Sequence, residues 1–278
     1  MRKRRVINAV MFSITGLCAF MSVGILFFIL GYLLWSGGTN LNWDFFTKLP
    51  VPVGEPGGGM ANAIVGSAKL LLLATLFGVP IGFLSGVYLA EFGGTTFSTF
   101  VRYTTDLLNG VPSIVIGIFA YTAVVMPSHH FSTLAGGLAL GVMMIPISVR
   151  STEEFLRAVP HSLREAAAAV GASKSRAVFT VVVPAAIRGI ATGTMLDLAR
   201  VAGETAPLLF TSFNNRFWSR GLDEPTASLP VMIYTYAIGP YSDWHQQAWA
   251  AGFVLVISVL VVNVCARLIV SRRGYRAM

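Results

Sequence analysis

Three ionisable side chains, those of Asp197, Arg200 and Glu204, interrupt an otherwise apolar stretch of the chain. Their offsets of three and seven residues complete nearly whole helical turns, so an α-helix would carry them on one face. A charge that faces lipid costs about 3 kcal/mol even on lenient insertion scales. We therefore predict that this face looks into protein or a water-filled path, and that the chain handles something polar within a membrane.

The composition and the long apolar runs indicate a membrane protein. Hydrophobic residues make up 55% of the sequence and charged residues only 12%, well below the charge content of a soluble domain. A helix needs about 20 apolar residues to cross a bilayer. We predict an all-α, polytopic protein with six transmembrane helices, near residues 10–35, 61–90, 107–126, 134–149, 185–212 and 248–270.

The basic residues are distributed unevenly about these spans. Of the 20 lysines and arginines, Lys69 and Arg200 lie within spans, and only Lys48, Arg216 and Arg220 fall on the side opposite the N-terminus. By the positive-inside rule, both termini are predicted to be cytoplasmic. The net charge of +8 reflects this topology rather than nucleic-acid binding, which would need a basic soluble module.

No pattern of catalytic or metal-ligating residues stands out. Cys18 and Cys265 fall in the first and last predicted spans, where we expect buried small side chains and no disulfide. His129 and His130 are predicted to lie in a solvated external turn, with no acidic residue or cysteine nearby in the chain to complete a metal site. The histidines lie outside the spans, and no Gly-x-Ser-x-Gly nucleophile motif occurs, so an intramembrane enzyme has little support.

The stretch from residue 150 to 183 is too polar to enter lipid. Ser151 with Glu154, and Ser162 with Glu165, both fit the capping-box pattern, so two short helices are predicted here. Gly171 can end a helix in the left-handed conformation. Ser173 is then expected to cap a further helix that runs to Pro184. The result is a predicted cytoplasmic helix-turn-helix elbow.

Glu165-Ala166-Ala167-Ala-Ala-Val-Gly171, followed twelve residues later by Val183-Pro184, resembles the EAA loop of ABC importer permeases. Four further segments strengthen the resemblance and make it specific to the phosphate permeases of the PstA family. They are VAGETAPLLFT (201–211), NGVPSIVIG (109–117), PIG (80–82) with YLAE (88–91), and LPVMIY (229–234). The resemblance extends from about residue 62 to 267.

The resemblance implies a type I ABC importer permease of MetI-like architecture in the bacterial cytoplasmic (inner) membrane. It divides the chain into a first helix with an external loop (1–60), a permease domain (61–270) with a coupling loop at about 150–184, and a cytoplasmic tail (271–278). It also implies four kinds of partner: a second, PstC-like permease, two PstB-like ATPase subunits, an external PstS-like phosphate-binding protein, and phosphate itself. Because the chain has no phosphate-binding P-loop, ATP and magnesium are expected on the partner ATPase, and this chain is expected to bind no cofactor.

The resemblance assigns roles to two sets of residues. Coupling to the ATPase is expected at the EAA loop, through Glu165, Ala166, Ala167, Gly171 and Pro184. The translocation path is expected to include Arg200, Glu204, Asp197 and Lys69.

Arg200 is the best candidate for contact with phosphate, because its guanidinium stays charged and offers paired donors. Asp197 and Glu204 could neutralise Arg200 when the path is empty, or accept the proton of a partly protonated phosphate. Two alternatives stay open: the trio could be an ion-paired seam between helices or permeases, and Lys69 could extend to the membrane interface. The rival function is an ion- or proton-coupled secondary transporter or channel, which would use the trio as a relay but would not need the elbow.

Overall fold

The computed structural model describes residues 2–52, 55 and 57–274, and the side chains of residues 3–52, 55 and 57–268. Within these ranges the chain is helical and contains no strand, which confirms the all-α class. The long helices are α1 (Arg2–Thr39), α3 (Ala61–Glu91), α4 (Thr96–Gly110), α7 (Thr133–Arg157), α10 (Val183–Val201) and α13 (Ser242–Gly274). The short ones are α2 (Trp43–Thr47), α5 (Ser113–Ala120), α6 (Met126–Ser128), α8 (His161–Ala169), α9 (Lys174–Ala177), α11 (Ala206–Thr211) and α12 (Leu229–Ala237), with π-helical turns η1 (Tyr121–Val125) and η2 (Val178–Val182).

Five helical segments within the described ranges are long and apolar enough to cross a membrane. They are α1, α3, α7, the continuous segment Lys174–Val201, and α13. A sixth crossing is reached if α4 and the segment Ser113–Ser128 count as one span, although the two are bent by 104° relative to each other. The helices therefore agree with a polytopic protein of up to six spans.

Two predicted spans are wrong as continuous helices. The third (107–126) breaks between α4 and α5, because Val111 precedes Pro112 and takes up an extended conformation (φ −72°, ψ 128°). The fifth (185–212) ends at Val201 and resumes only at α11. Glu204 therefore lies in the break and is not on the helix that carries Asp197 and Arg200.

The capping-box predictions are also wrong. Ser151 lies inside α7, which continues to Arg157, so the region before Gly171 holds one short helix instead of two. That helix, α8, begins after Pro160, and no side chain caps it. Ser173 does precede α9, as predicted, although its hydroxyl accepts no capping hydrogen bond.

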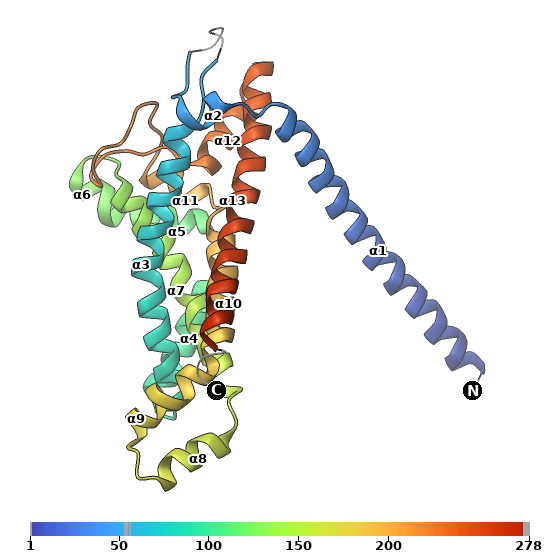
Figure 1. Ribbon diagram of the computed structural model, residues 1–278, viewed down its shortest axis with the longest axis vertical. Coiled ribbons are helices and arrows are strands. Elements are labelled where there is room, and N and C mark those ends of the chain that lie inside the picture. Colours follow the sequence, from blue (N-terminus) through green and yellow to red (C-terminus); the bar gives the residue numbers. More distant parts are fainter. Residues whose placement is uncertain (1, 53–54, 56, 275–278) are drawn as a thin grey trace.

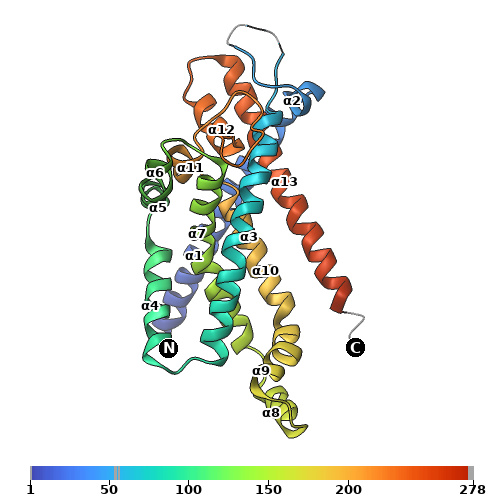
Figure 2. The same ribbon diagram turned by 90° about the vertical axis from the view of Figure 1, so that its left-hand side faces the viewer.

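The helices form an elongated bundle with one outlying member (Figures 1 and 2). Helix α1 leads away from the bundle and touches it near its C-terminal end, where Tyr32 packs edge-on against Trp249 of α13 at 4.9 Å between ring centroids. The N-terminal end of α1 and the C-terminal end of α13 lie toward the same end of the bundle as α8 and α9, which we call the elbow end. Helices α2 and α12 lie at the opposite end, the loop end.

Helices α3 and α7 pack closely because small residues line their contact. A Cβ atom on Gly78 would lie 2.7 Å from the Gly141 carbonyl oxygen. One on Gly82 would lie 2.5 Å from the Ser148 Cβ, and one on Gly86 would lie 2.6 Å from the Thr152 Cβ. This spacing of four residues along α3 brings the two backbones together, as small residues do in membrane helix pairs.

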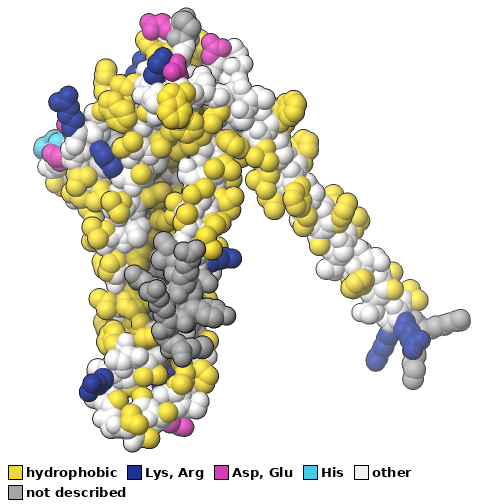
Figure 3. Space-filling model, in the orientation of Figure 1, with side chains coloured by type: hydrophobic (Ala, Val, Ile, Leu, Met, Phe, Trp, Pro, Cys, Tyr) yellow, Lys and Arg dark blue, Asp and Glu magenta, His cyan; other side chains and the backbone are white. Residues whose placement is uncertain are grey.

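The buried apolar side chains form three clusters along the bundle. The loop-end cluster contains Phe45, Met60 and Tyr236, and the middle cluster contains Leu70, Leu140, Val201 and Leu208. The elbow-end cluster contains Val87, Leu156, Val178, Val182 and Ile190. Hydrophobic side chains also cover the middle of the visible face, whereas most charged side chains lie toward the ends (Figure 3). Apolar atoms on both the inside and the outside are expected of a bundle that faces lipid.

Two smaller predictions can be compared with the structure. Cys18 and Cys265 are both exposed, contrary to the expected burial. Of the predicted tail (271–278), residues 271–274 continue α13, and residues 275–278 lie outside the described residues.

Candidate functional site

The charged trio does not form an ion-paired group in the structure. The Asp197 side chain is buried, with 2% of the residue exposed, and neither of its carboxylate oxygens has a hydrogen-bond partner among the described residues. Arg200 is exposed, and Glu204 is half-buried beyond the end of α10. Within the described ranges, no ion pair of 4.0 Å or less includes any of the three. The expected pairing of Arg200 with Asp197 or Glu204 is therefore wrong for this conformation.

Arg200 lies well inside the thickness of the bundle. Its neighbours Val201 and Ala202 share a small cavity with Ser67 and Leu70 of α3. Leu70 is the tenth residue of α3, which places this level about 14 Å from the loop end of that helix. An exposed guanidinium at this depth would be costly in lipid, so protein or water must cover this side of α10 in the membrane.

Lys69 is held by the loop between α11 and α12, residues 212–228. Its ammonium donates a hydrogen bond to the carbonyl oxygen of Ser219, at 2.7 Å. Asn62 of α3 also donates to the carbonyl of Asn215 in this loop, and the Ser67 hydroxyl of α3 accepts from the amide of Leu229, the first residue of α12. Lys69 therefore fixes this loop close to the loop end of α3.

Two segments that carried the family resemblance meet in space. Gly117 of α5 is so close to Pro207 of α11 that an added Cβ would lie 2.6 Å from the Pro207 Cα. Pro207 belongs to the segment that includes Glu204, and Gly117 belongs to the segment that bends at Pro112. The two short helices that follow the breaks in the third and fifth predicted spans thus pack against each other.

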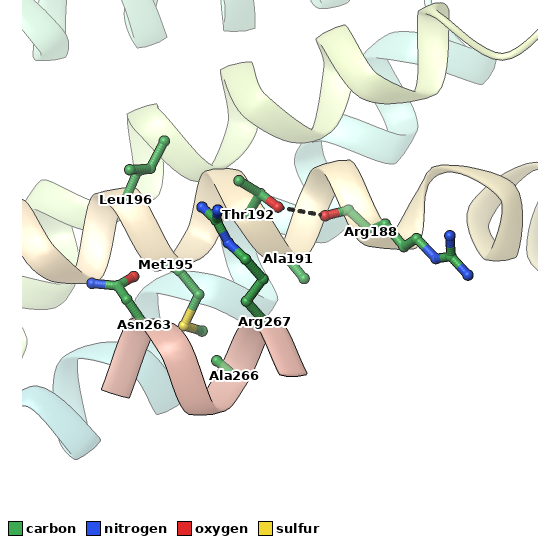
Figure 4. Close-up of a pocket in the computed structure, with 8 residues that line it drawn as sticks. All are labelled: Arg188, Ala191, Thr192, Met195, Leu196, Asn263, Ala266 and Arg267. Carbon is green, nitrogen blue, oxygen red and sulfur yellow. Dashed lines mark hydrogen bonds between the residues drawn. The ribbon is translucent and has the colours of Figure 1, made fainter. Parts of the chain in front are cut away.

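A cavity of about 130 Å³ lies between α10 and α13 (Figure 4). Arg267 of α13 extends across it toward Thr192 of α10, whereas the guanidinium of Arg188 points away. The Thr192 hydroxyl is already used, because it donates to the Arg188 carbonyl at 2.8 Å. The two arginines do not converge, so the cavity is not built to enclose an anion.

The elbow forms where the sequence placed it. Gly171 has φ of +80°, in the left-handed region, and has no atom within 4 Å of an added Cβ. The chain turns there from α8 to α9, and the π-helical turn η2 then leads to Pro184 in the first turn of α10. A proline tolerates this position because its missing amide hydrogen is not needed in the first turn of a helix.

The EAA residues divide between the two faces of α8. Glu165 and Ala166 are exposed, as are Gly171 and Pro184, whereas Ala167 is buried with 7% of its surface exposed. One face of α8 therefore rests on the bundle, and the other is presented outward at the elbow end. This is the arrangement that a docking helix requires.

The ion pairs at the elbow end were not predicted from the sequence. Arg164 of α8 contacts Glu91 at the end of α3, with 2.5 Å between Nη2 and Oε1. Arg102 of α4 and Arg157 both contact Glu153 of α7, each at 2.8 Å. A further pair joins Arg150 of α7 to Asp106 of α4.

These pairs join residues 44 to 73 positions apart, except for Arg157 with Glu153. Only the long-range fold brings such residues together, so their spacing carried no signal. The one available sign was Glu91 itself, an acidic residue at the end of an apolar helix and inside a segment that carried the resemblance.

A family model matches most of the chain. Residues 78–274 match the family described as "Binding-protein-dependent transport system inner membrane component". Among curated proteins, the chain is 43% identical to the phosphate transport system permease protein PstA of Yersinia pestis, covering 92% of this chain and 89% of that one. It is 42% identical to the protein of the same name from Haemophilus influenzae, covering 95% and 94%.

Solved structures show the same fold at lower identity. An inward-facing MetNI methionine ABC transporter matches with a TM-score of 0.63 and 20% identity, covering 77% of this chain and 96% of that one. A bacterial ABC transporter involved in the import of alginate matches with a TM-score of 0.65 and 15% identity, covering 92% and 95%. These matches confirm the MetI-like architecture expected from the sequence.

Proposed function

The chain belongs to the family of binding-protein-dependent transport system inner membrane components, and from this premise we propose that it is a permease subunit of an ATP-driven phosphate importer. Its relatives at about 40% identity are named phosphate transport permeases and match over nearly the whole chain. The apolar helices agree with a multi-pass protein of the inner membrane. A secondary transporter or channel has no comparable support.

The single structural observation that carries the proposal is Arg200 on α10. It is a cation at membrane depth, exposed in the isolated chain and without an ion-pair partner among the described residues. Such a residue needs a second protein surface, a water-filled path or an anion beside it. A permease that forms half of an anion path supplies all three.

We place phosphate contact at Arg200, because a guanidinium fits phosphate oxygens with paired donors. Asp197 lies one turn away on α10 and is the nearest acidic residue on that helix. Glu204 lies in the break after α10, where its amide donates to the carbonyl of Val201 at 3.1 Å. Lys69 contributes by holding the loop between α11 and α12 over the loop end of the path.

We propose the remaining subunits by analogy with the family. The second permease is PstC-like and covers the Arg200 side of α10. Two PstB-like ATPase subunits hold ATP and magnesium, because the sequence of this chain has no P-loop, and a PstS-like protein delivers phosphate at the loop end. The outward face of α8, with Glu165 and Ala166, docks on the ATPase, while Gly171 and Pro184 set the shape of the elbow.

The elbow end is then cytoplasmic, and so are both termini. The distribution of lysine and arginine favours this orientation. The N-terminal end of α1 and the C-terminal end of α13 also lie toward the elbow end (Figures 1 and 2). We keep the proposed division of the chain into a first helix with its loop (1–60), a permease domain (61–270) and a cytoplasmic tail (271–278).

Reconstitution tests the proposal directly. The two permeases and the ATPase are placed in vesicles with the elbow end outward. The external binding protein and radiolabelled phosphate are enclosed inside, and ATP with magnesium is added outside. We expect phosphate to leave the lumen only when ATP is hydrolysed, and not when the ATPase carries an inactivating substitution. Phosphate movement without ATP, or movement driven by a proton or sodium gradient alone, would contradict the proposal.

A further inference from the structure

Arg164 attaches α8 to the rest of the bundle through several bonds at once. Its guanidinium contacts both carboxylate oxygens of Glu91: Nη2 lies 2.5 Å from Oε1, and Nε lies 3.2 Å from Oε1 and 3.3 Å from Oε2. The same group donates to two backbone carbonyls after and within α7, Val159 at 2.6 Å and Leu156 at 2.8 Å. One side chain therefore joins α8 to the ends of both α3 and α7.

This contact is sheltered from solvent. The Glu91 side chain is 6% exposed and the Arg164 side chain is 20% exposed. Leu156 is fully buried in the elbow-end cluster. A bidentate arginine–carboxylate pair in such surroundings holds a fixed geometry, unlike a solvated surface pair.

Within the described part of the chain, no other side-chain hydrogen bond or ion pair joins α8 to α3 or α7. Among the described residues, every ion pair and side-chain hydrogen bond of α8 involves Arg164. Arg102 with Glu153 joins α4 to α7, and Arg157 with Glu153 stays within α7. Lys174 of α9 lies 4.9 Å from the ring centroid of Phe92, which directly follows α3, so this contact joins α9 to the end of α3.

The Arg164–Glu91 contact lies on the inward face of α8, opposite the exposed face. Glu165, next to Arg164 in the chain, is exposed on the outward face, and Ala167, one turn beyond Arg164, is buried. A force applied to the outward face would reach the bundle through the inward face. Arg164 and Glu91 form the ion pair on that route.

We propose that Arg164 and Glu91 form a latch that makes α3 and α7 move with α8, and that both are positioning residues for coupling ATP hydrolysis to transport. The proposal rests on the proposed function, because it takes α8 as the ATPase docking helix. Helices α3 and α7 also pack along their glycine contact, so the latch would pass a displacement of α8 to the middle of the bundle. A physical link of this kind, with partners on both sides, is what energetic coupling between distant sites requires.

The first test measures coupling in the reconstituted complex with the variants Arg164→Ala, Arg164→Lys and Glu91→Gln. We expect the ATPase to remain bound and to hydrolyse ATP, while the phosphate moved per ATP falls about tenfold with Arg164→Ala. Arg164→Lys should restore part of the ratio, because it keeps the charge but loses the paired donors. Arg157→Ala is the matched control: it removes an arginine–glutamate pair confined to one helix and should leave the ratio unchanged.

The second test measures movement and needs no phosphate. In a chain with Cys18 and Cys265 replaced by serine, spin labels are placed at exposed positions on α8 (His161→Cys) and α3 (Leu84→Cys). With the latch intact, the distance between the labels should stay the same when nucleotide is added. With Glu91→Gln or Arg164→Ala, the distance should change, because α8 moves without α3.

The outcomes separate the latch from the proposed function. A wild-type ratio of phosphate to ATP in all three latch variants would overturn the latch, and so would a label distance that changes equally with and without it. Loss of the ATPase from the complex in the variants would also overturn it, since the pair would then serve docking and not transmission. If instead the wild-type complex moves no phosphate, the proposed function fails, and the label distances still decide whether the latch exists. If Arg164→Ala does not insert into membranes, the two milder variants carry both tests.

Discussion

The elbow end and the charged site on α10 treat their ionisable residues in opposite ways. At the elbow end, Glu91 and Glu153 are buried, and each has an arginine partner from another element. On α10, Asp197 is just as buried but has no partner among the described residues, and Arg200 is exposed at membrane depth. Both regions belong to one chain and one bundle, so the difference is not a matter of composition.

The contrast separates two uses of charge. A buried pair satisfied within the chain fixes helices relative to one another, and removing either partner leaves an uncompensated charge. A buried or membrane-depth charge without a partner in the chain costs free energy until something else supplies one. We therefore read the charges at the elbow end as paired within the chain, and we propose that the α10 site is completed by the second permease and the transported anion.

Replacing Arg200 should have the largest effect on function. In the reconstituted complex, we expect Arg200→Ala to lower phosphate transport about 100-fold, because charged hydrogen bonds contribute about 1.5–3 kcal/mol each. Assembly should be preserved, since Arg200 makes no ion pair within the described chain. Arg188→Ala is the control, because that guanidinium lies on the same helix and points away from the cavity in Figure 4. Equal transport by the two variants would remove the basis for placing phosphate at Arg200.

The packing that joins the two regions can be broken at Gly82. A valine there would place its Cβ 2.5 Å from the Ser148 Cβ of α7, and overpacking of this kind costs about 1–3 kcal/mol. The midpoint of thermal unfolding in detergent should fall, and transport should fall with it. Gly16→Val in α1, where an added Cβ meets no atom within 4 Å, is the control. A stability unchanged by Gly82→Val would mean that α3 and α7 are less tightly packed than described.

Asp197→Asn distinguishes the two uses of charge most clearly. If the carboxylate is unpartnered in the isolated chain, a neutral amide of the same size should leave thermal stability equal or higher. Transport should nevertheless fall about tenfold, because a counter-charge near the path is lost. Glu91→Gln should instead lower thermal stability, because Arg164 loses its charged partner. A strong loss of stability with Asp197→Asn would show that the aspartate already has an essential partner within the chain.

The smallest expected effect is at Gly171. A non-glycine residue at φ +80° is strained by about 1 kcal/mol, while no neighbouring atom would clash. We expect Gly171→Ala to weaken binding of the ATPase roughly fivefold, and Gly171→Asn to do so less, because asparagine tolerates this conformation. Binding can be measured by titrating the ATPase onto permease in nanodiscs. Equal effects of the two substitutions would argue against backbone strain as the cause.

The sequence predicted the elements whose signals are local. Long apolar runs identified most of the spanning helices, and Gly171 marked the turn of the elbow because its conformation depends on the residue itself. The same local reasoning failed where two signals competed. Apolar character over residues 185–212 suggested one helix, whereas the helix breaks at residues 202–205, between α10 and α11. Ser151 had a capping pattern, but packing of α7 kept it inside the helix.

The partners of the charged residues could not be predicted, because pairing depends on the three-dimensional fold. Arg164 and Glu91 are 73 positions apart, and nothing in either local sequence names the other. The same limit affected the trio on α10. A spacing of three and four residues places side chains on one helical face only if the helix continues, and Glu204 lies beyond the end of α10.

The most direct test of the account is the surroundings of position 200 in the assembled complex. With Cys18 and Cys265 replaced by serine, Arg200→Cys is treated with a charged, membrane-impermeant thiol reagent, with and without phosphate and the external binding protein. We predict that the reagent reacts with and without phosphate, because the side chain faces a polar path shared with the second permease. A cysteine that resists this reagent but reacts with a lipid-soluble one would place position 200 in hydrocarbon and contradict the account.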